Sequence, residues 1–588
     1  MYWLEDQVVI AFHSPLPPTA DRQQIIDSLQ LDVLRQFLQL RGFDLLPFTQ
    51  DDMPRPLGEE MAAPDSEDVN DPTGKYLFAA PGGGTTVIAF FHIDSYKTFH
   101  PVQDLMPHDR ARTFGGDGTP EQQVVNIINN SLEQLRLHGQ IPVVAATPNW
   151  LGGTTCFTHG CSYTSLPVQD DAPAHWSYKL PELSNTLQAS TGKGVNMFVL
   201  DTMPRYEQIG QAAEAAGERN WLLQEILAQH QQGNIVMTYQ QLPQLLREDA
   251  DDQIGTGRDI YRRTTSCLME DHGLFVTGII HDIAPDAKIE YVRTLNDFGA
   301  GDIHMFIHEL EKIHNRMLPA QAGRAAGDLY NQPVVINMSL VFMLHRDQAP
   351  EMWYAREDTV CVHDLGEIVL NTERLRVPLH MVIRSMAALG AIMVGSTGND
   401  SNAPDVPYRI ESRYPAAFPE VIAVGSLDKF GHAAPFANYP AIPPYSNGIA
   451  TYGGGLPTPE PSTPPPFRAE NYPKITVKDI DSPRGIYTSP RYHALSNDDP
   501  ETVYDAPNKD AWAYWSGTSF AVPVISAVAA RLLEGQADNI QNLPPHLRAA
   551  QVQWAITSAQ GQQAMLTKNG PLPIEEALNV SRLTAVQE

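Results

Sequence analysis

From residue 195 onward, short apolar runs alternate with stretches of helical pattern. Each run has the length of one buried strand, and strands that alternate with helices are typical of a parallel sheet with helices on both faces. Functional side chains in such sheets gather just beyond the carboxyl ends of the strands. The residues that follow each run are therefore the first place to look for a site. The runs are VNMFVL, AKIEYVRTL, PVVINMSL, AIMVGSTGN and VIAVGSL.

The first 150 residues predict a smaller α/β module. An apolar run at residues 8–12 is followed by a helical pattern with its apolar residues on one face, and a second such pattern lies at residues 125–135. Between them, two apolar runs flank the glycines at 82–84, which permit the tight turn of a hairpin. An apolar segment at residues 142–150 closes the module. The order strand, helix, strands, helix, strand is the split βαβ plan.

These patterns divide the chain into three expected parts. Residues 1–150 form the α+β module, and residues 151–191, rich in Gly, Ser, Thr and Pro, form a linker. Residues 192–588 form the large α/β domain. Two segments interrupt its pattern and are expected to be surface insertions, a polar helical one at about 203–265 and a proline-rich one at about 440–510.

Composition excludes several classes of function. The 588 residues carry 69 Asp and Glu against 40 Lys and Arg, a formal net charge of -29, which disfavours an electrostatic hold on nucleic acid or an anionic membrane. No apolar run approaches the roughly 20 residues that span a bilayer, and the first residues lack the pattern of a secretory leader. Four cysteines cannot form a disulfide framework in a chain of this length. We therefore expect a soluble, cytoplasmic protein.

Ser519 is the first candidate for chemistry. It lies in SGTSFAVPVISAVAARLLE, where small residues precede it and a long apolar helix follows. At a helix start, the helix dipole and unpaired backbone N–H groups favour developing negative charge, as a nucleophile and its oxyanion require. Pro523 is expected in the first turn, where its missing N–H costs little. Taken alone, a serine in this position is most often a helix cap.

A serine nucleophile needs a base and a third group that orients the base. His272 stands just before a helical segment in which Gly273 and Gly278 permit close packing, and Asp201 ends the apolar strand VNMFVLD. An acid at the carboxyl end of a strand is well placed to hold an imidazole. We therefore expect Asp201, His272 and Ser519 to act together, although each alone fits an ordinary turn, core or cap residue.

Asn399 is a candidate oxyanion donor. It follows the strand-like run in AIMVGSTGND, and its amide could donate a hydrogen bond to a tetrahedral intermediate. An Asn between Gly398 and Asp400 could instead only satisfy a turn.

These four segments, in wording and order, resemble those of the subtilases, the subtilisin-like serine proteases. The chain order Asp, His, Ser is also that of subtilisin. The resemblance spans residues 195 to about 533 and implies a subtilisin-like doubly wound parallel sheet, preceded by an α+β propeptide-like domain. It also implies a serine endopeptidase that acts through an acyl-enzyme. Further matching segments are GTSFAVP, HGLFVTGII with the following APDAKI, VVINMSL and YPAAFPEVIAVGSLD.

The resemblance assigns two sets of substrate-binding residues and a role for the N-terminal module. Ser339 and Leu340 would line the edge that pairs with an extended substrate. The module would act as an inhibitor in cis and a folding aid, released by cleavage between roughly 150 and 185. The substrate would be a restricted protein or precursor peptide. The wall of the main specificity pocket would be formed by Gly395, Ser396, Thr397 and Gly398.

The sequence departs from the family pattern in three places. Thr202, Met203 and Pro204 follow Asp201, where a glycine commonly follows the hydroxyl residue. Leu274 stands where a threonine is usual, and ATYGGG replaces the usual Ala-Pro-Gly turn ahead of the serine. These departures bear on substrate preference and loop geometry rather than on the type of reaction.

The sequence specifies no cofactor. Cys156, His159 and Cys161 in CFTHGC lack the spacing of a zinc finger and a second ligand pair, so we expect no metal there. The resemblance requires no metal or organic cofactor. Calcium stays open, because many family members bind it but no dense Asp or Asn loop specifies a site here.

Two other functions compete with the protease. One is a catalytically silent scaffold of the same fold that binds a partner protein through its insertions. The other is an esterase of a different serine hydrolase family, which is disfavoured because the motif GxSxG is absent around Ser519 and the order of the three residues differs.

Overall fold

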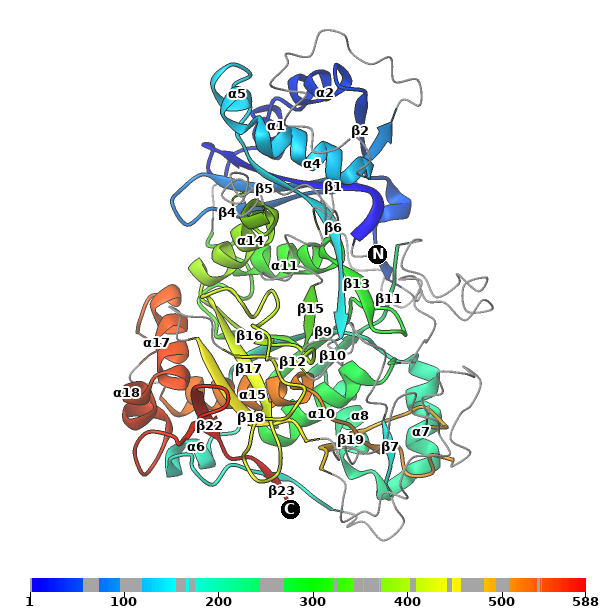
Figure 1. Cartoon of the computed structure of the whole chain (residues 1–588). Coiled ribbons are helices and arrows are strands. Elements are labelled where there is room, and N and C mark those ends of the chain that lie inside the picture. Colours follow the sequence, from blue (N-terminus) through cyan, green and yellow to red (C-terminus); the bar gives the residue numbers. More distant parts are fainter. Residues whose placement is uncertain are drawn as a thin grey trace.

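The computed structural model has two stacked parts joined by one long strand, with the N-terminal module on top in Figure 1 and the large α/β domain below. The structure describes residues 3–56, 73–95, 119–154, 165–168, 175–243, 269–320, 325–342, 353, 370, 372–401, 409–440, 447–455, 481–492, 507–536, 540 and 542–588.

The large domain is built on a nine-stranded sheet, and all its neighbouring strands except the last pair run parallel. The five apolar runs of the sequence all form strands of this sheet. In spatial order, the strands are β10 (Ile235–Thr238), β12 (Lys288–Arg293), β9 (Asn196–Asp201), β14 (Val334–Met338), β16 (Ala391–Ser396), β17 (Val421–Leu427), β18 (Gly448–Tyr452), β22 (Val580–Leu583) and β21 (Ile574–Glu575).

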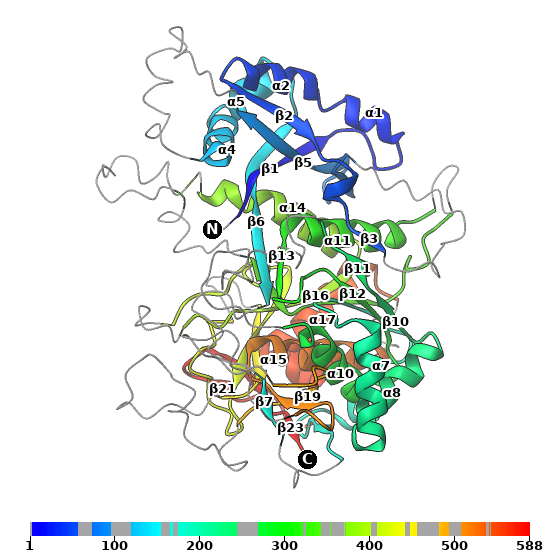
Figure 2. The ribbon, with the colours of Figure 1, turned by 90° about the vertical axis from the view of Figure 1, so that its right-hand side faces the viewer.

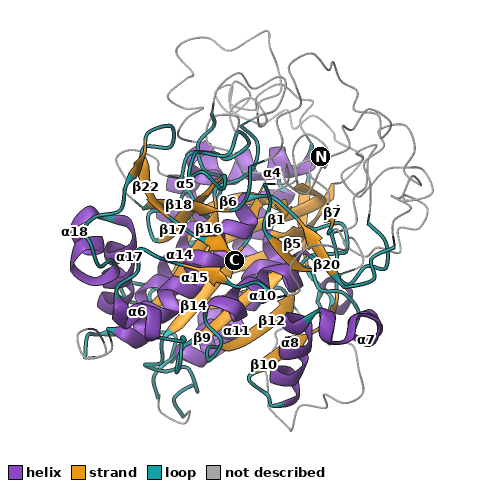
Figure 3. Cartoon of the chain, turned by 90° about the horizontal axis from the view of Figure 1, so that it is seen from below, coloured by secondary structure: helices purple, strands orange, loops and turns teal. Residues whose placement is uncertain are grey.

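Helices cover both faces of this sheet (Figure 3). Because successive side chains of a strand point to opposite faces, β9 sends Phe198 and Leu200 into one core and Met197 and Val199 into the other. The first core contains α11 (Ile303–Met317) and α14 (Val377–Ala388), and the second contains α10 (His272–Ile283) and α15 (Thr518–Gly535). Among the described residues, the domain also contains α6 (Asn185–Ala189), α7 (Tyr206–Ala216), α8 (Trp221–Gln231), α17 (Pro545–Thr557) and α18 (Ala559–Gly561).

Among the described residues, α15 is the one helix long and apolar enough to pass a test for a membrane span. It is 83% buried inside the protein, as expected of a core helix.

The N-terminal module is an antiparallel sheet with helices on its outer face (Figure 2). Its central strands are ordered β6, β1, β5, β2, and β4 pairs beside β5. The element order along the chain is that of the split βαβ plan. The elements are β1 (Trp3–Ser14), α1 (Arg22–Asp27), α2 (Leu31–Gln39), β2 (Phe43–Pro47), β4 (Lys75–Ala79), β5 (Thr85–Ser95), α4 (Pro120–Asn130), α5 (Leu132–Leu137) and β6 (Val143–Thr154).

The module sits on α11 and α14, which lie between it and the nine-stranded sheet in Figures 1 and 2. Apolar side chains of the module and of these helices form one continuous core. Polar contacts cross the same boundary. The Tyr76 hydroxyl shares a hydrogen bond of 2.6 Å with His304, and the Ala79 N–H donates to His314 Nε2 at 2.9 Å. Burial of this mixed surface holds the two parts together.

Strand β6 extends further than the sequence predicted. We expected the last strand of the module to end at Trp150 and a linker to begin at residue 151, yet β6 continues to Thr154. Its final residues pair on one side with β13 (Ala300–Asp302) and on the other with β15 (Leu340–Phe342), both antiparallel. Backbone hydrogen bonding on both edges, which local sequence does not reveal, holds this glycine-containing segment in strand form.

The expected insertions also contain parts of the fold. β10 lies inside the segment 203–265 and forms an edge of the main sheet, while α8 packs against α10. β18, within 440–510, is an interior strand. Residues 244–268 and 456–480 are outside the described residues. Short strands complete the described set: β3 (Arg55–Pro56), β11 (Gln240–Gln241), β7 (Leu166–Pro167), β8 (Tyr178–Lys179), β19 (Arg484–Ile486), β20 (Trp512–Tyr514) and β23 (Val586–Gln587).

Candidate active site

Three adjacent parallel strands end at the same edge of the main sheet and carry candidate residues there. Asp201 is the last residue of β9, Ser339 follows β14, and Asn399 lies three residues beyond β16. Because β9, β14 and β16 are neighbours in this order, their carboxyl ends converge as the sequence pattern predicted.

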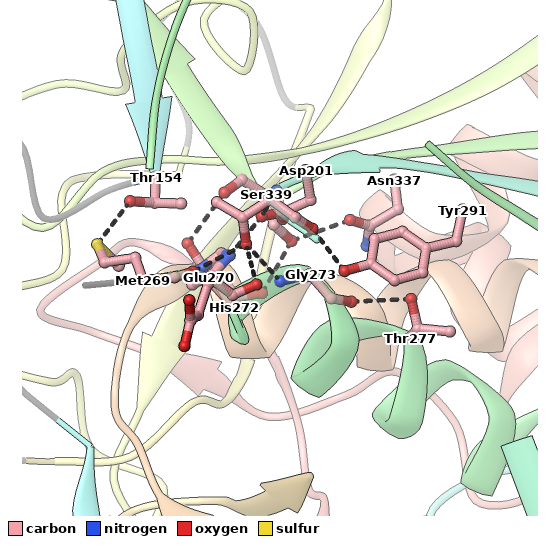
Figure 4. Close-up of polar contacts among 12 residues, drawn as sticks. Thr154, Asp201, Met269, Glu270, His272, Gly273, Thr277, Tyr291, Asn337 and Ser339 are labelled. Carbon is pink, nitrogen blue, oxygen red and sulfur yellow. Dashed lines mark hydrogen bonds and ion pairs between the residues drawn. The ribbon is translucent and has the colours of Figure 1, made fainter. Parts of the chain in front are cut away.

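Asp201 and His272 form a buried pair at this edge (Figure 4). His272 Nδ1 lies 2.8 Å from Asp201 Oδ1, and both side chains are almost fully buried. Thr202 strengthens the arrangement, because its hydroxyl donates to the Met269 carbonyl at 2.8 Å and accepts from the Gly273 N–H at 3.2 Å. The end of β9 is thereby tied to both sides of His272.

Gly273 allows this close approach. A Cβ added at Gly273 would lie 2.3 Å from the Thr202 carbonyl oxygen and 2.7 Å from Asp201 Cβ. No side chain fits in that space without moving backbone. The glycine after His272 is therefore what lets α10 begin directly against β9.

Ser519 is the second residue of α15 and stands directly before Phe520, which packs against His272. The ring of Phe520 is 5.1 Å from the His272 ring, centroid to centroid, and the ring of Trp515 is 5.6 Å away. The Ser519 hydroxyl is buried and donates to the Ser339 carbonyl at 3.1 Å. All three residues expected to act together therefore gather at the carboxyl edge of the sheet.

Pro523 corrects one expectation and explains a contact of Ser339. We expected Pro523 in the first turn, but α15 begins at Thr518, so Pro523 is its sixth residue. A proline there cannot donate to the carbonyl four residues earlier, which belongs to Ser519. The Ser339 hydroxyl takes that place, 2.9 Å from the Ser519 carbonyl oxygen.

Asn399 is oriented by the start of the same helix. Its Oδ1 accepts from the backbone N–H of Thr518 at 3.0 Å and from the Thr518 hydroxyl at 2.9 Å. With Oδ1 so engaged, Nδ2 comes within 3.1 Å of the position that a Cβ on Gly517 would take. The Asn399 amide therefore lies against the turn that leads into Ser519.

A buried polar network fixes the loop that carries Asn399. The Arg413 guanidinium pairs with the Asp400 carboxylate at 2.5 Å, and both side chains are buried. Asn438 donates to the Thr397 carbonyl at 3.0 Å and accepts from the Asp400 N–H at 3.1 Å. A buried, mutually bonded network of this kind holds one conformation.

The expected wall of the specificity pocket, residues 395–398, directly precedes Asn399 in the sequence. Gly395 and Ser396 end β16, and Gly398 has a φ of 108°, a left-handed conformation that favours glycine. Within the described part of the chain, the buried hydroxyls of Ser396 and Thr397 have no hydrogen-bond partner. Buried hydroxyls left without partners cost free energy.

Two acidic residues just before His272 were missed by the sequence reasoning. The Asp271 carboxylate accepts from the backbone N–H and the hydroxyl of both Thr488 and Ser489. Burial raises the pKa of Asp271, and burial together with the Asp271 charge raises the pKa of Glu270 to about 7. Thr488 and Ser489 lie some 217 residues from Asp271 along the chain, so no local pattern could have indicated the contact.

The structure adds a second edge to the expected substrate site. Leu340 was expected to pair with an extended substrate, and it pairs with Thr154 at the end of β6. The opposite edge is β13, whose Ala300 pairs with Gly153.

Thr154, the last residue of β6, donates its N–H to the Gly299 carbonyl at 2.9 Å and contacts Met269 Sδ at 3.0 Å (Figure 4). An extended segment of the chain thus fills a slot that ends next to His272. The sequence signal that could have indicated this edge is GAGD, whose glycines at 299 and 301 allow another backbone to approach closely.

No group of three or more His, Cys, Asp or Glu suited to a metal occurs among the residues that the structure describes. Cys156, His159 and Cys161 lie in the segment 155–164, outside those residues.

Comparison with known proteins assigns the chain to a family. A search of curated proteins finds no match. Among solved structures, a lanthipeptide protease is 14% identical, with 68% of this chain and 88% of that chain covered and a TM-score of 0.35. A protease of Pseudoalteromonas arctica is 19% identical, with 68% of this chain and 91% of that chain covered and a TM-score of 0.35. A prenylagaramide maturation protease is 16% identical, with 66% of this chain and 90% of that chain covered and a TM-score of 0.33. The model of the subtilase family matches residues 264–571, more than half of the sequence. The chain therefore belongs to the subtilase family of serine proteases.

Proposed function

We propose that this chain is an endopeptidase that uses Ser519 as nucleophile, His272 as general base and Asp201 as the group that orients the base. The observation that carries the proposal is the buried 2.8 Å contact between His272 Nδ1 and Asp201 Oδ1 at the strand edge where Ser519 also lies. A carboxylate on Nδ1 holds the tautomer whose Nε2 accepts a proton.

The reaction is acyl transfer. The Ser519 hydroxyl turns from the Ser339 carbonyl to His272, gives up its proton, and attacks the peptide carbonyl carbon. His272 passes that proton to the departing amine as the C–N bond breaks. Water then attacks the acyl-enzyme as His272 takes its proton. His272 returns this proton to the Ser519 oxygen as the ester C–O bond breaks and the carboxylic acid leaves. Asp201 stabilises the imidazolium in both steps.

Asn399 and the Ser519 backbone N–H serve as the oxyanion donors in this proposal. Two hydrogen bonds from Thr518 hold Asn399 Oδ1, which leaves the donor nitrogen to face the start of α15. Donors fixed before the reaction stabilise the tetrahedral intermediate without a cost of reorganisation.

The same proposal makes the N-terminal module a propeptide-like inhibitor in cis. β6 takes up the strand-shaped slot between β13 and β15, the way an extended peptide adds to a sheet edge. β6 ends at Thr154, which contacts Met269, three residues before His272. Cleavage at or shortly after this point, within the expected interval 150–185, would free the slot for a protein or peptide substrate.

Mass spectrometry of freshly purified protein tests the proposal. We expect the wild-type chain to break within residues 150–185 and the Ser519→Ala chain to stay intact. The processed wild type should cleave casein or a peptide library. Ser519→Ala should lose activity by roughly a million-fold, as loss of the nucleophilic serine does in subtilisin. A wild-type chain that stays intact yet is fully active would rule out the zymogen. A chain that neither breaks nor cleaves peptides would favour the silent scaffold.

A further inference from the structure

Gly152 lies at a point in the slot where no side chain fits. It pairs with Gly301 of β13 on one side and with Phe342 of β15 on the other. A Cβ added at Gly152 would lie 2.3 Å from Cδ1 and 2.8 Å from Cε1 of the Phe342 ring, and 2.7 Å from the Val341 carbonyl oxygen. Carbon atoms in contact normally lie about 3.5–4.0 Å apart. Even alanine is therefore too large at this position.

Phe342 is held in place by its neighbours. Its side chain is buried, and its ring packs against Phe306 of α11 at 5.3 Å between centroids. Its backbone N–H donates to the Tyr414 carbonyl at 2.8 Å, which fixes the strand from the far side. A rigid backbone and a close-packed ring resist overpacking.

We propose that Phe342 is a specificity-determining residue, which restricts the slot to peptides that carry glycine at the position facing it. The inference rests on the proposed function, because it assumes that substrates bind where β6 now lies. It names a substrate class: extended peptides aligned like the segment Leu151–Gly152–Gly153–Thr154, with glycine at the second of these four positions.

The test in trans uses the processed enzyme and two synthetic peptides. One has the sequence of residues 147–158, TPNWLGGTTCFT, and the other has alanine in place of Gly152. We expect kcat/KM for the alanine peptide to be roughly tenfold to a hundredfold lower. In a Phe342→Ala enzyme, the ratio between the two peptides should fall clearly but stay above one, because the Val341 carbonyl oxygen still lies 2.7 Å from the added Cβ. General damage to the fold would lower both values together and leave the ratio unchanged.

A second variant keeps the test decisive if Phe342→Ala does not fold. Phe342→Leu fills most of the same space with a smaller, flexible side chain, so we expect a ratio between those of the wild type and Phe342→Ala. A ratio that stays at the wild-type value in a folded Phe342→Leu enzyme would contradict the role of this ring.

The test in cis uses the full chain and follows its intact mass with time. We expect Gly152→Ala to slow processing by roughly tenfold or more. The double variant Gly152→Ala, Phe342→Ala should recover part of the rate, because it removes the clash with the ring but not the one with the Val341 carbonyl oxygen. Gly82→Ala is the matched control: this glycine is exposed, and a Cβ there meets nothing within 4 Å. Its processing should match that of the wild type.

The outcomes separate the two proposals. Equal cleavage of both peptides by an active enzyme overturns the glycine requirement and leaves the protease intact. Cleavage of neither peptide, together with an unbroken wild-type chain, overturns the proposed function and the inference with it.

Discussion

Acidification should weaken the contact between the N-terminal module and α11, because that contact buries a neutral histidine. His304 lies inside the contact, with its Nε2 2.6 Å from the Tyr76 hydroxyl and its ring against those of Phe48 and Phe90. Burial, with a smaller contribution from His308, lowers the pKa of His304 to about 3. Burial also lowers the pKa of His308 well below its ordinary value.

The sign follows from proton linkage. A histidine exposed by separation or unfolding takes up a proton below about pH 6.5, whereas the buried one stays neutral down to about pH 3. Stability is therefore lost as the pH falls through this interval. Each pH unit below 6.5 costs about 1.4 kcal/mol, so His304 alone costs roughly 2 kcal/mol at pH 5.

Other groups act at the same contact, so the assay must isolate His304. Asp302, whose carboxylate accepts from Asn149 at 2.9 Å, has a pKa raised by burial to about 6 and gains stability on acidification. His92 and Asp52 lie near as a pair 2.9 Å apart. We therefore compare Ser519→Ala with Ser519→Ala, His304→Gln, since glutamine keeps an acceptor for Tyr76 but does not titrate.

Urea unfolding at about pH 7.5 and pH 5.0, followed by tryptophan fluorescence, measures the effect. Trp3, Trp150 and Trp353 form a ring cluster in the module and its contact, so their emission reports on separation. Between the two pH values, the chain with His304 should lose roughly 2 kcal/mol more than the His304→Gln chain. Equal losses in the two chains would refute the reasoning.

Three further changes test the site itself. Asn399→Ala should lower kcat roughly a hundred- to a thousandfold in a peptide cleavage assay, in a chain that still unfolds cooperatively, and an unaltered kcat would exclude the oxyanion role. Asp271→Asn should cost roughly 1–3 kcal/mol in urea unfolding, because the amide nitrogen cannot accept from a buried backbone N–H of Thr488 or Ser489; an unchanged midpoint would contradict this. Gly273→Ala should abolish activity in a chain that still unfolds cooperatively, since its Cβ would meet the Thr202 carbonyl, and wild-type kcat/KM in this variant would contradict the close approach.

The sheet and the residues at its edge could be predicted because their signals are local. Asp201, Ser339 and Asn399 each follow an apolar run, and parallel strands bring such positions to one edge. Ser519 and His272 lie near helix starts, which the local sequence indicates well. Resemblance to a family then supplied their roles.

The contacts that the sequence did not indicate are long-range. Residues 151–154 contain two glycines and read as a linker, yet they form a strand because partners about 150 and 190 residues away supply both edges. β10 was hidden in an expected insertion, since an edge strand of four residues gives a weak pattern. The contacts of the α11 histidines are also long-range, because His304 and His314 meet Tyr76 and Ala79, which lie 228 and 235 residues away in the sequence.

The central claim is that Ser519 is the nucleophile. Its most direct test is to treat the processed protein with a fluorophosphonate probe and to map the labelled peptide by mass spectrometry. The account predicts label on Ser519 in the wild type, none in Ser519→Ala, and a large reduction in His272→Ala, because the hydroxyl then lacks its base. Label on another serine such as Ser526, or no label in wild-type protein that has been processed, would contradict it.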